Sequence, residues 1–172
     1  IAASGLDGIH LTNENLVTQH LRTLVTKKKM SKILIIEDEA AIRRVLTKIL
    51  SEENDSYQVE EAEDGVSGFE KIKNNDYDLV LCDIKMPKMD GVEVLEAVKK
   101  IKPEIPMVMI SGHGDMETAI NTMRLGAFDY ISKPPDLNRL LNTVRNALDN
   151  KQLVVENKIL KKKVRDRKST RL

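Results

Sequence analysis

Acidic side chains follow two short apolar runs of the sequence, at the point where each run ends. Glu37 and Asp38 come directly after the first run, and Asp83 follows a later one. A hydroxyl group, that of Ser111, follows another apolar run, and the amine of Lys133 lies shortly beyond the last one. Three carboxylates, a hydroxyl and an amine are groups that could together support phosphoryl transfer, which depends on positioning and on neutralisation of charge.

Three carboxylates at one site would repel one another, and each would raise the pKa of the others. A divalent cation removes this conflict, and Mg²⁺ prefers oxygen ligands. We therefore expect Asp38 and Asp83 to bind Mg²⁺ directly, Glu37 to act through water, and the backbone carbonyl of Lys85 to add a ligand. An ionised Asp83 could then serve as a nucleophile, because aspartyl phosphates are established covalent intermediates.

The remaining two groups fit the same chemistry. Lys133 would neutralise phosphoryl oxygens, and the hydroxyl of Ser111 would donate a hydrogen bond to another. Each residue also has a purely structural interpretation. Glu37 and Asp38 could cap the helix that follows them, Asp83 and Ser111 could belong to ordinary turns, and Lys133 could be solvated. All of these structural interpretations would have to hold at once for the five residues to have no common function.

Alternating strands and helices must bring these residues together. Short apolar runs predict strands at residues 32–36, 78–82 and 106–110, and two further strands are predicted at 57–62 and 127–131. Helical periodicity predicts helices at 40–50, 65–73, 92–101 and 116–125, with Val45, Val66 and Ile101 among their core positions, and a last helix capped by Asp136. This alternation predicts an α/β fold with a doubly wound, five-stranded parallel sheet. Such sheets bind ligands at the carboxyl ends of their strands, where all five groups would lie.

Composition limits the classes of protein that this chain can represent. Apolar residues make up 41% of the 172 residues, which is enough for a core. No apolar run approaches the length of a membrane span. A single cysteine, Cys82, allows no internal disulfide framework and indicates a cytoplasmic setting. Aromatic residues make up only 3%, which disfavours platforms for stacked bases.

The distribution of charge divides the chain into three parts. Residues 31–150 are acidic, whereas residues 151–172 are strongly basic. We interpret residues 1–30 as a leader derived from an expression vector, with a native start at Met30, and the end of the tail, 165–172, as partly of the same origin. The domain would then span 31–150, with a basic helical linker at 151–172.

The last predicted helix has no obvious stop, because no Gly or Pro follows Leu137. Along its extension, residues at alternating spacings of three and four could form a short coiled-coil seam: Asn150, Leu153, Asn157, Leu160 and Val164. This seam predicts an extended C-terminal helix and a homodimer contact through it. A solvated helix that frays is the alternative.

Residues 31–150 resemble the receiver domain of two-component response regulators. Four motifs carry the resemblance: Ile35 to Glu39, Asp83 to Gly91, Ser111 to Gly114, and Tyr130 to Pro134. The resemblance implies a flavodoxin-like sheet with strand order 2-1-3-4-5. It implies that Asp83 is the phosphoacceptor, that Glu37 and Asp38 help bind Mg²⁺, and that Ser111 and Lys133 contact the phosphoryl group.

The same resemblance implies a switch and a partner. Tyr130 matches the aromatic switch position, which turns inward when Ser111 is drawn to the phosphate, and the bond between Lys133 and Pro134 matches a cis peptide. The phosphodonor would be a sensor histidine kinase, and the surface of the fourth predicted helix, fifth strand and last helix would change on phosphorylation. Such a domain is a regulatory phosphoacceptor and not an enzyme.

Ser111 to Ala119, Gly126 to Tyr130 and the continuous basic helix are similar to NtrC-like transcriptional activators. This similarity implies transcription control, with DNA bound only through an output domain that the sequence does not contain. Two alternatives remain open. One is a stand-alone relay or adaptor receiver, which the basic helix disfavours. The other is a phosphohydrolase of small phosphoesters, which Lys85 disfavours because such enzymes usually have a second acid there.

Overall fold

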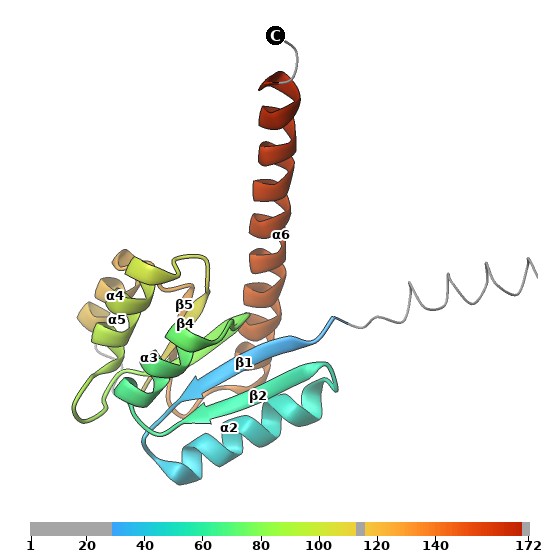
Figure 1. Ribbon diagram of the computed structural model, residues 1–172. Coiled ribbons are helices and arrows are strands. Elements are labelled where there is room, and N and C mark those ends of the chain that lie inside the picture. Colours follow the sequence, from blue (N-terminus) through green and yellow to red (C-terminus); the bar gives the residue numbers. More distant parts are fainter. Residues whose placement is uncertain (1–28, 113–115, 170–172) are drawn as a thin grey trace, which may run out of the picture. The chain divides into compact units, whose positions relative to one another are not determined.

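Five parallel strands form a single sheet in the order β2-β1-β3-β4-β5 (Figure 1). The computed structural model describes residues 29–112 and 116–169, so most of the expected leader lies outside the described residues. The strands are β1 (Ser31–Ile36), β2 (Tyr57–Ala62), β3 (Leu79–Asp83), β4 (Met107–Ser111) and β5 (Asp129–Ser132). The predicted doubly wound parallel sheet is therefore confirmed, as is the strand order that the resemblance implied.

Helices cover both faces of this sheet and enclose two separate apolar clusters. The helices are α2 (Ala40–Glu53), α3 (Gly65–Asn74), α4 (Gly91–Ile101), α5 (Met116–Arg124) and α6 (Leu137–Ser169). One cluster joins the sheet to α3 and α4, and the other joins it to α2 and α6. Strand β1 contributes Leu34 and Ile36 to the first cluster, and Ile33 and Ile35 to the second. Burial on both faces explains why β1 is a continuous apolar run.

The prediction that three apolar side chains lie in the core is wrong. Val45, Val66 and Ile101 are each about half exposed, with 57%, 46% and 47% of their surface accessible. In α3 the contact with the sheet is made partly by Gly68, where a Cβ would lie 2.5 Å from Cδ1 of Ile36. The close approach of that backbone turns the helix so that Val66 faces outward.

Three strands end one residue later than predicted. Strand β3 includes Asp83, β4 includes Ser111, and β5 includes Ser132. Asp83 pairs with Ile110 across the two strands, and Ser111 pairs with Ser132 of β5. Both functional candidates are therefore held by sheet hydrogen bonding and not by a loop, which fixes their backbone more firmly.

Helix α6 starts where it was predicted and continues well beyond the sheet (Figure 1). The backbone N–H of Arg139 donates to the side chain of Asp136 at 2.8 Å, which confirms the predicted cap. Leu153, Leu160 and Val164 of the expected seam are more than half exposed. Within the part of the chain that the structure describes, no helix combines the length and apolar character needed to cross a membrane.

Candidate functional site

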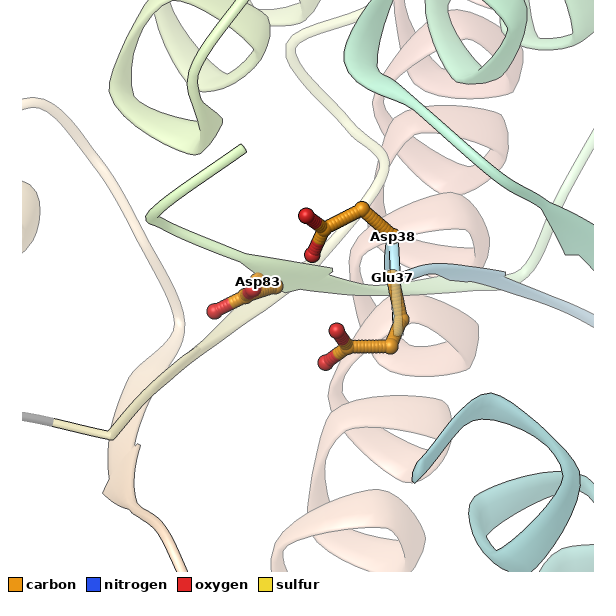
Figure 2. Close-up of side chains that lie close together, drawn as sticks. All are labelled: Glu37, Asp38 and Asp83. Carbon is orange, nitrogen blue, oxygen red and sulfur yellow. The ribbon is translucent and has the colours of Figure 1, made fainter. Parts of the chain in front are cut away.

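The three acidic side chains meet at the carboxyl end of the sheet. Glu37 and Asp38 follow β1, and Asp83 ends the adjacent strand β3. Each offers one carboxylate oxygen, and these oxygens lie within 4.8 Å of one another. Figure 2 shows the three carboxyl groups on the same side of the strand ends. The convergence predicted from sequence therefore occurs, because adjacent parallel strands end at the same edge.

Lys133 reaches this acidic cluster from the loop that follows β5. Its Nζ lies 2.7 Å from Oε2 of Glu37 and 3.3 Å from Oδ1 of Asp83. All three side chains are largely buried, with 12%, 1% and 5% of their surface exposed for Lys133, Glu37 and Asp83. The peptide bond between Lys133 and Pro134 is cis, as the resemblance implied. One ammonium thus serves two buried carboxylates.

One ammonium group faces several carboxylates, and the pKa values of the site reflect this shortage of positive charge. Burial raises the pKa of Glu37 and of Asp83, although Lys133 opposes both shifts. Burial by itself would lower the pKa of Lys133, but its hydrogen bond to Glu37 and the charge of Asp83 outweigh burial and raise it. The site therefore holds its lysine charged and retains an excess of negative charge that a cation can balance.

Ser111 and Tyr130 lie on the next two strands of the same sheet. Ser111 is buried at the end of β4, and its carbonyl accepts the backbone N–H of Lys133 at 2.8 Å. Tyr130, in β5, packs partly buried against the cluster beneath α3 and α4. Its hydroxyl is buried without a hydrogen-bond partner among the described residues. The side chain of Lys85 is exposed, and a ligand role for its carbonyl stays a prediction.

The structural interpretation of these acids as helix caps finds little support. The N-cap of α2 is Glu39, which makes no side-chain capping bond, although its N–H donates to Oε1 of Glu37 at 3.0 Å. Helices α3 and α4 are capped by Asp64 and Asp90. Asp83 caps none of the helices in the described ranges and belongs to the sheet.

Two residues that support the site were assigned no role from the sequence. Gly91 begins α4 and donates its N–H to the carbonyl of Ile84 at 2.8 Å, and a Cβ there would collide with the carbonyl oxygen of Asp83. Arg43, in the first turn of α2, donates to the carbonyl of Glu37 at 2.6 Å. A glycine next to the predicted helix 92–101 was a visible signal for Gly91, whereas no local pattern marks Arg43. Residues 113 and 114 of the third motif lie outside the described residues.

Comparison with known proteins identifies the class to which this fold and site belong. A family model of the response regulator receiver domain matches residues 33–145. The transcriptional regulatory protein ZraR of Klebsiella oxytoca is 35% identical over 121 residues, which cover 70% of this chain and 27% of ZraR. A putative response regulator of Rickettsia bellii, described as NtrX-like, is 36% identical over 137 residues, covering 78% of this chain and 28% of its own length.

A solved structure extends this likeness to three dimensions. The crystal structure of NtrX from Brucella abortus matches with a TM-score of 0.70 and 38% identity, over 76% of this chain and 29% of that one. The chain belongs to the response regulator receiver domain family, and its relatives ZraR and NtrX are NtrC-family regulators. Membership gives it a regulatory role in two-component signalling. The chain spans little more than a quarter of the length of these relatives.

Proposed function

We propose that this chain is a phosphoacceptor switch in which Asp83 receives a phosphoryl group from a phosphohistidine of a sensor histidine kinase. The observation that carries the proposal is the position of Lys133, whose ammonium lies 2.7 Å from Glu37 and 3.3 Å from Asp83. An ammonium held beside a buried carboxylate can neutralise the oxygens of a phosphoryl group bound to that carboxylate.

The donor set fits Mg²⁺. Three carboxylate oxygens from Glu37, Asp38 and Asp83 lie close enough to share one ion, and oxygen ligands are those that Mg²⁺ prefers. Asp38 is exposed, which leaves room for the waters that Mg²⁺ usually retains. Glu37, Asp38 and Asp83 would hold the ion, with the carbonyl of Lys85 as a further ligand. When bound, Mg²⁺ supplies positive charge that offsets the repulsion between carboxylates and phosphoryl oxygens.

The transfer needs no other covalent chemistry from the protein. A carboxylate oxygen of Asp83 forms a bond to phosphorus while the nitrogen–phosphorus bond of the phosphohistidine breaks, and the imidazole nitrogen keeps that bonding pair. Lys133 balances charge on the phosphoryl oxygens, and the hydroxyl of Ser111 donates a hydrogen bond to one of them. The raised pKa of Lys133 supports this role, because the lysine stays charged.

The structural response would follow the sheet from Ser111 to the next strand. Ser111 pairs with Ser132, so a shift of its side chain toward the phosphoryl group acts next to β5. The unpartnered hydroxyl of Tyr130 in β5 supports a switch role, since a buried hydroxyl without a partner gains by moving. Phosphorylation would thus bias a two-state equilibrium in the surface formed by α5, β5 and α6.

The output would lie outside this sequence. By analogy with the longer relatives, we propose that the change controls transcription in the cytoplasm and that DNA is bound only through a missing output domain. The exposed seam of α6, with Leu153, Leu160 and Val164, would form a homodimer contact that passes the change along. Sedimentation over a range of protein concentrations tests this contact.

Incubation with a labelled acyl phosphate tests the central proposal. We expect the wild-type chain to take up one phosphoryl group in Mg²⁺ and none in EDTA, and Asp83→Asn to take up none. Asp90→Asn is the matched control, because Asn also caps a helix and should leave α4 intact. Uptake by Asp83→Asn at the wild-type rate would refute the proposal. Multiple turnover of a chromogenic phosphoester would favour a phosphohydrolase instead.

A further inference from the structure

The side chain of Arg43 connects the ends of two strands behind the acidic cluster. It rises from the first turn of α2, and one guanidinium nitrogen, Nη1, donates to the carbonyl oxygen of Glu37 at 2.6 Å. Its Nε donates to Oε2 of Glu61 in β2 at 3.1 Å. The side chain is only 14% exposed although it lies on a surface helix. Arg43 therefore clamps the end of β1 to the end of β2.

The carbonyl that Arg43 binds belongs to the peptide group between Glu37 and Asp38. The orientation of this peptide group influences the direction in which both carboxylates leave the backbone. The side chain of Glu37 is also held by burial and by Lys133. Asp38 is exposed, so packing restrains it less. A hydrogen bond to the shared peptide is thus a direct restraint on Asp38.

The other end of the clamp is itself fixed. Oε1 of Glu61 accepts the hydroxyl of Thr47 at 2.6 Å, and the backbone carbonyl of Glu61 accepts Nζ of Lys71 at 2.9 Å. The guanidinium group is planar and rigid, so one end held by Glu61 orients the other end at Glu37. A lysine at this position has a single point of charge and could not bridge both acceptors in this geometry.

We infer that Arg43 is a positioning residue for the cation site, acting through the peptide between Glu37 and Asp38. The inference rests on the proposed function and goes beyond it, because Arg43 touches neither the cation nor the phosphoryl group. It predicts a change in cation affinity opposite in sign to the change expected from charge alone. Loss of a nearby positive charge by itself strengthens cation binding through Coulomb's law, whereas loss of a positioning residue weakens it.

Titration of the full chain with Mg²⁺, followed by calorimetry, separates these effects. Arg43→Met keeps the length of the aliphatic stem and removes both donors. We expect it to weaken Mg²⁺ binding by about 10-fold, the lower end of what outer contacts of metal sites contribute. The matched control is Arg44→Met, which removes the same charge from the exposed neighbouring position. It should bind Mg²⁺ as tightly as the wild type or slightly more tightly.

Further variants keep the inference open to refutation if Arg43→Met does not fold. Arg43→Lys retains the charge and should still weaken binding, and Glu61→Gln should give a smaller loss in the same direction. At saturating Mg²⁺, phosphoryl uptake by these variants should approach the wild-type rate. Equal Mg²⁺ affinities for the Arg43 and Arg44 variants would overturn the inference while leaving the proposed function intact. A wild-type chain that bound no Mg²⁺ would overturn both.

Discussion

The two ends of the sheet use the same kinds of charged residue in different proportions. At the carboxyl end, two buried carboxylates and exposed Asp38 face one ammonium, that of Lys133. At the amino end, Lys32 pairs with Glu60 at 2.8 Å, and Lys151 of α6 pairs with Asp78 at 3.1 Å. The first end has an excess of negative charge, whereas the second is balanced.

The amino end also satisfies its polar groups more completely. The hydroxyl of the buried Tyr77 donates to Glu60 at 2.5 Å, and the backbone N–H of Lys32 donates to Asp78 at 2.8 Å. Nζ of Lys151 donates to the carbonyl of Tyr77 at 2.6 Å. This end therefore fastens α6 to the sheet with its charges paired, while the carboxyl end keeps the excess of negative charge on which the proposed cation site depends.

The pKa directions follow the same contrast. Hydrogen bonds from Lys32 and Tyr77 lower the pKa of Glu60, which is the sign of a satisfied carboxylate. Burial raises the pKa of Glu37, and the hydrogen bond from Lys133 offsets only part of this shift. At Glu60 the hydrogen-bond donors outweigh burial in setting the pKa, and at Glu37 burial outweighs the donors.

The largest loss of stability should come from removing the ammonium group of Lys133 at the carboxyl end. Lys133→Met leaves Glu37 and Asp83 buried without an ammonium, which should lower the free energy of unfolding by about 3 kcal/mol in metal-free buffer. Urea unfolding followed by circular dichroism measures this change. Lys100→Met, at an exposed position of α4, is the control and should change the stability by less than about 0.5 kcal/mol. Equal losses of stability in the two variants would show that the buried carboxylates do not depend on the ammonium group of Lys133.

An intermediate effect should come from the matching change at the amino end. Lys151→Met removes two hydrogen bonds, to Tyr77 and Asp78, from a side chain that is 17% exposed. We expect a loss of about 1–2 kcal/mol in urea unfolding. Lys158→Met, exposed farther along α6, should be neutral. Mg²⁺ affinity should not change, and if it does, the two ends are not independent.

The smallest changes in stability should come from neutralising one glutamate at each end of the sheet. These changes should have opposite signs. The pKa of Glu37 is raised above its ordinary value of 4.5, so its contribution to stability is lost as the pH rises through the raised value. Glu37→Gln should therefore stabilise the metal-free chain at pH 7 and reduce the gain in stability seen toward pH 5. The pKa of Glu60 is lowered, so its contribution is present above 4.5 and is lost as the pH falls through the lowered value.

Glu60→Gln should accordingly destabilise the chain at pH 7, by less than about 1 kcal/mol because the pair with Lys32 is partly exposed. The difference from wild type should disappear at acidic pH. Urea unfolding at pH 3, 5 and 7 in EDTA measures both variants. If both substitutions shift stability in the same direction at pH 7, the contrast between the two ends fails.

The central strands could be predicted well because both of their faces are buried. Strands β1, β3 and β4 are therefore largely apolar runs, whereas the edge strand β2 carries polar residues between Tyr57 and Ala62. Strands β1 and β2 nevertheless end where they were expected. The buried side of each helix was harder to predict. Apolar residues cover a broad arc of a helix surface, and tertiary contacts decide which part of that arc faces the core. Val66 illustrates this, since the contact between Gly68 and Ile36 decides which way α3 turns.

The sequence by itself determined which chemical groups lie at the carboxyl ends of the strands, because that follows from the alternation of apolar runs with polar residues. It also determined the start of α6 at the Asp136 cap. Only the tertiary structure decided that Lys133 crosses to Glu37, 96 residues away in the chain, and that Arg43 clamps the peptide beside it. Such contacts depend on strand order and on the reach of long side chains, and no local pattern of residues encodes either.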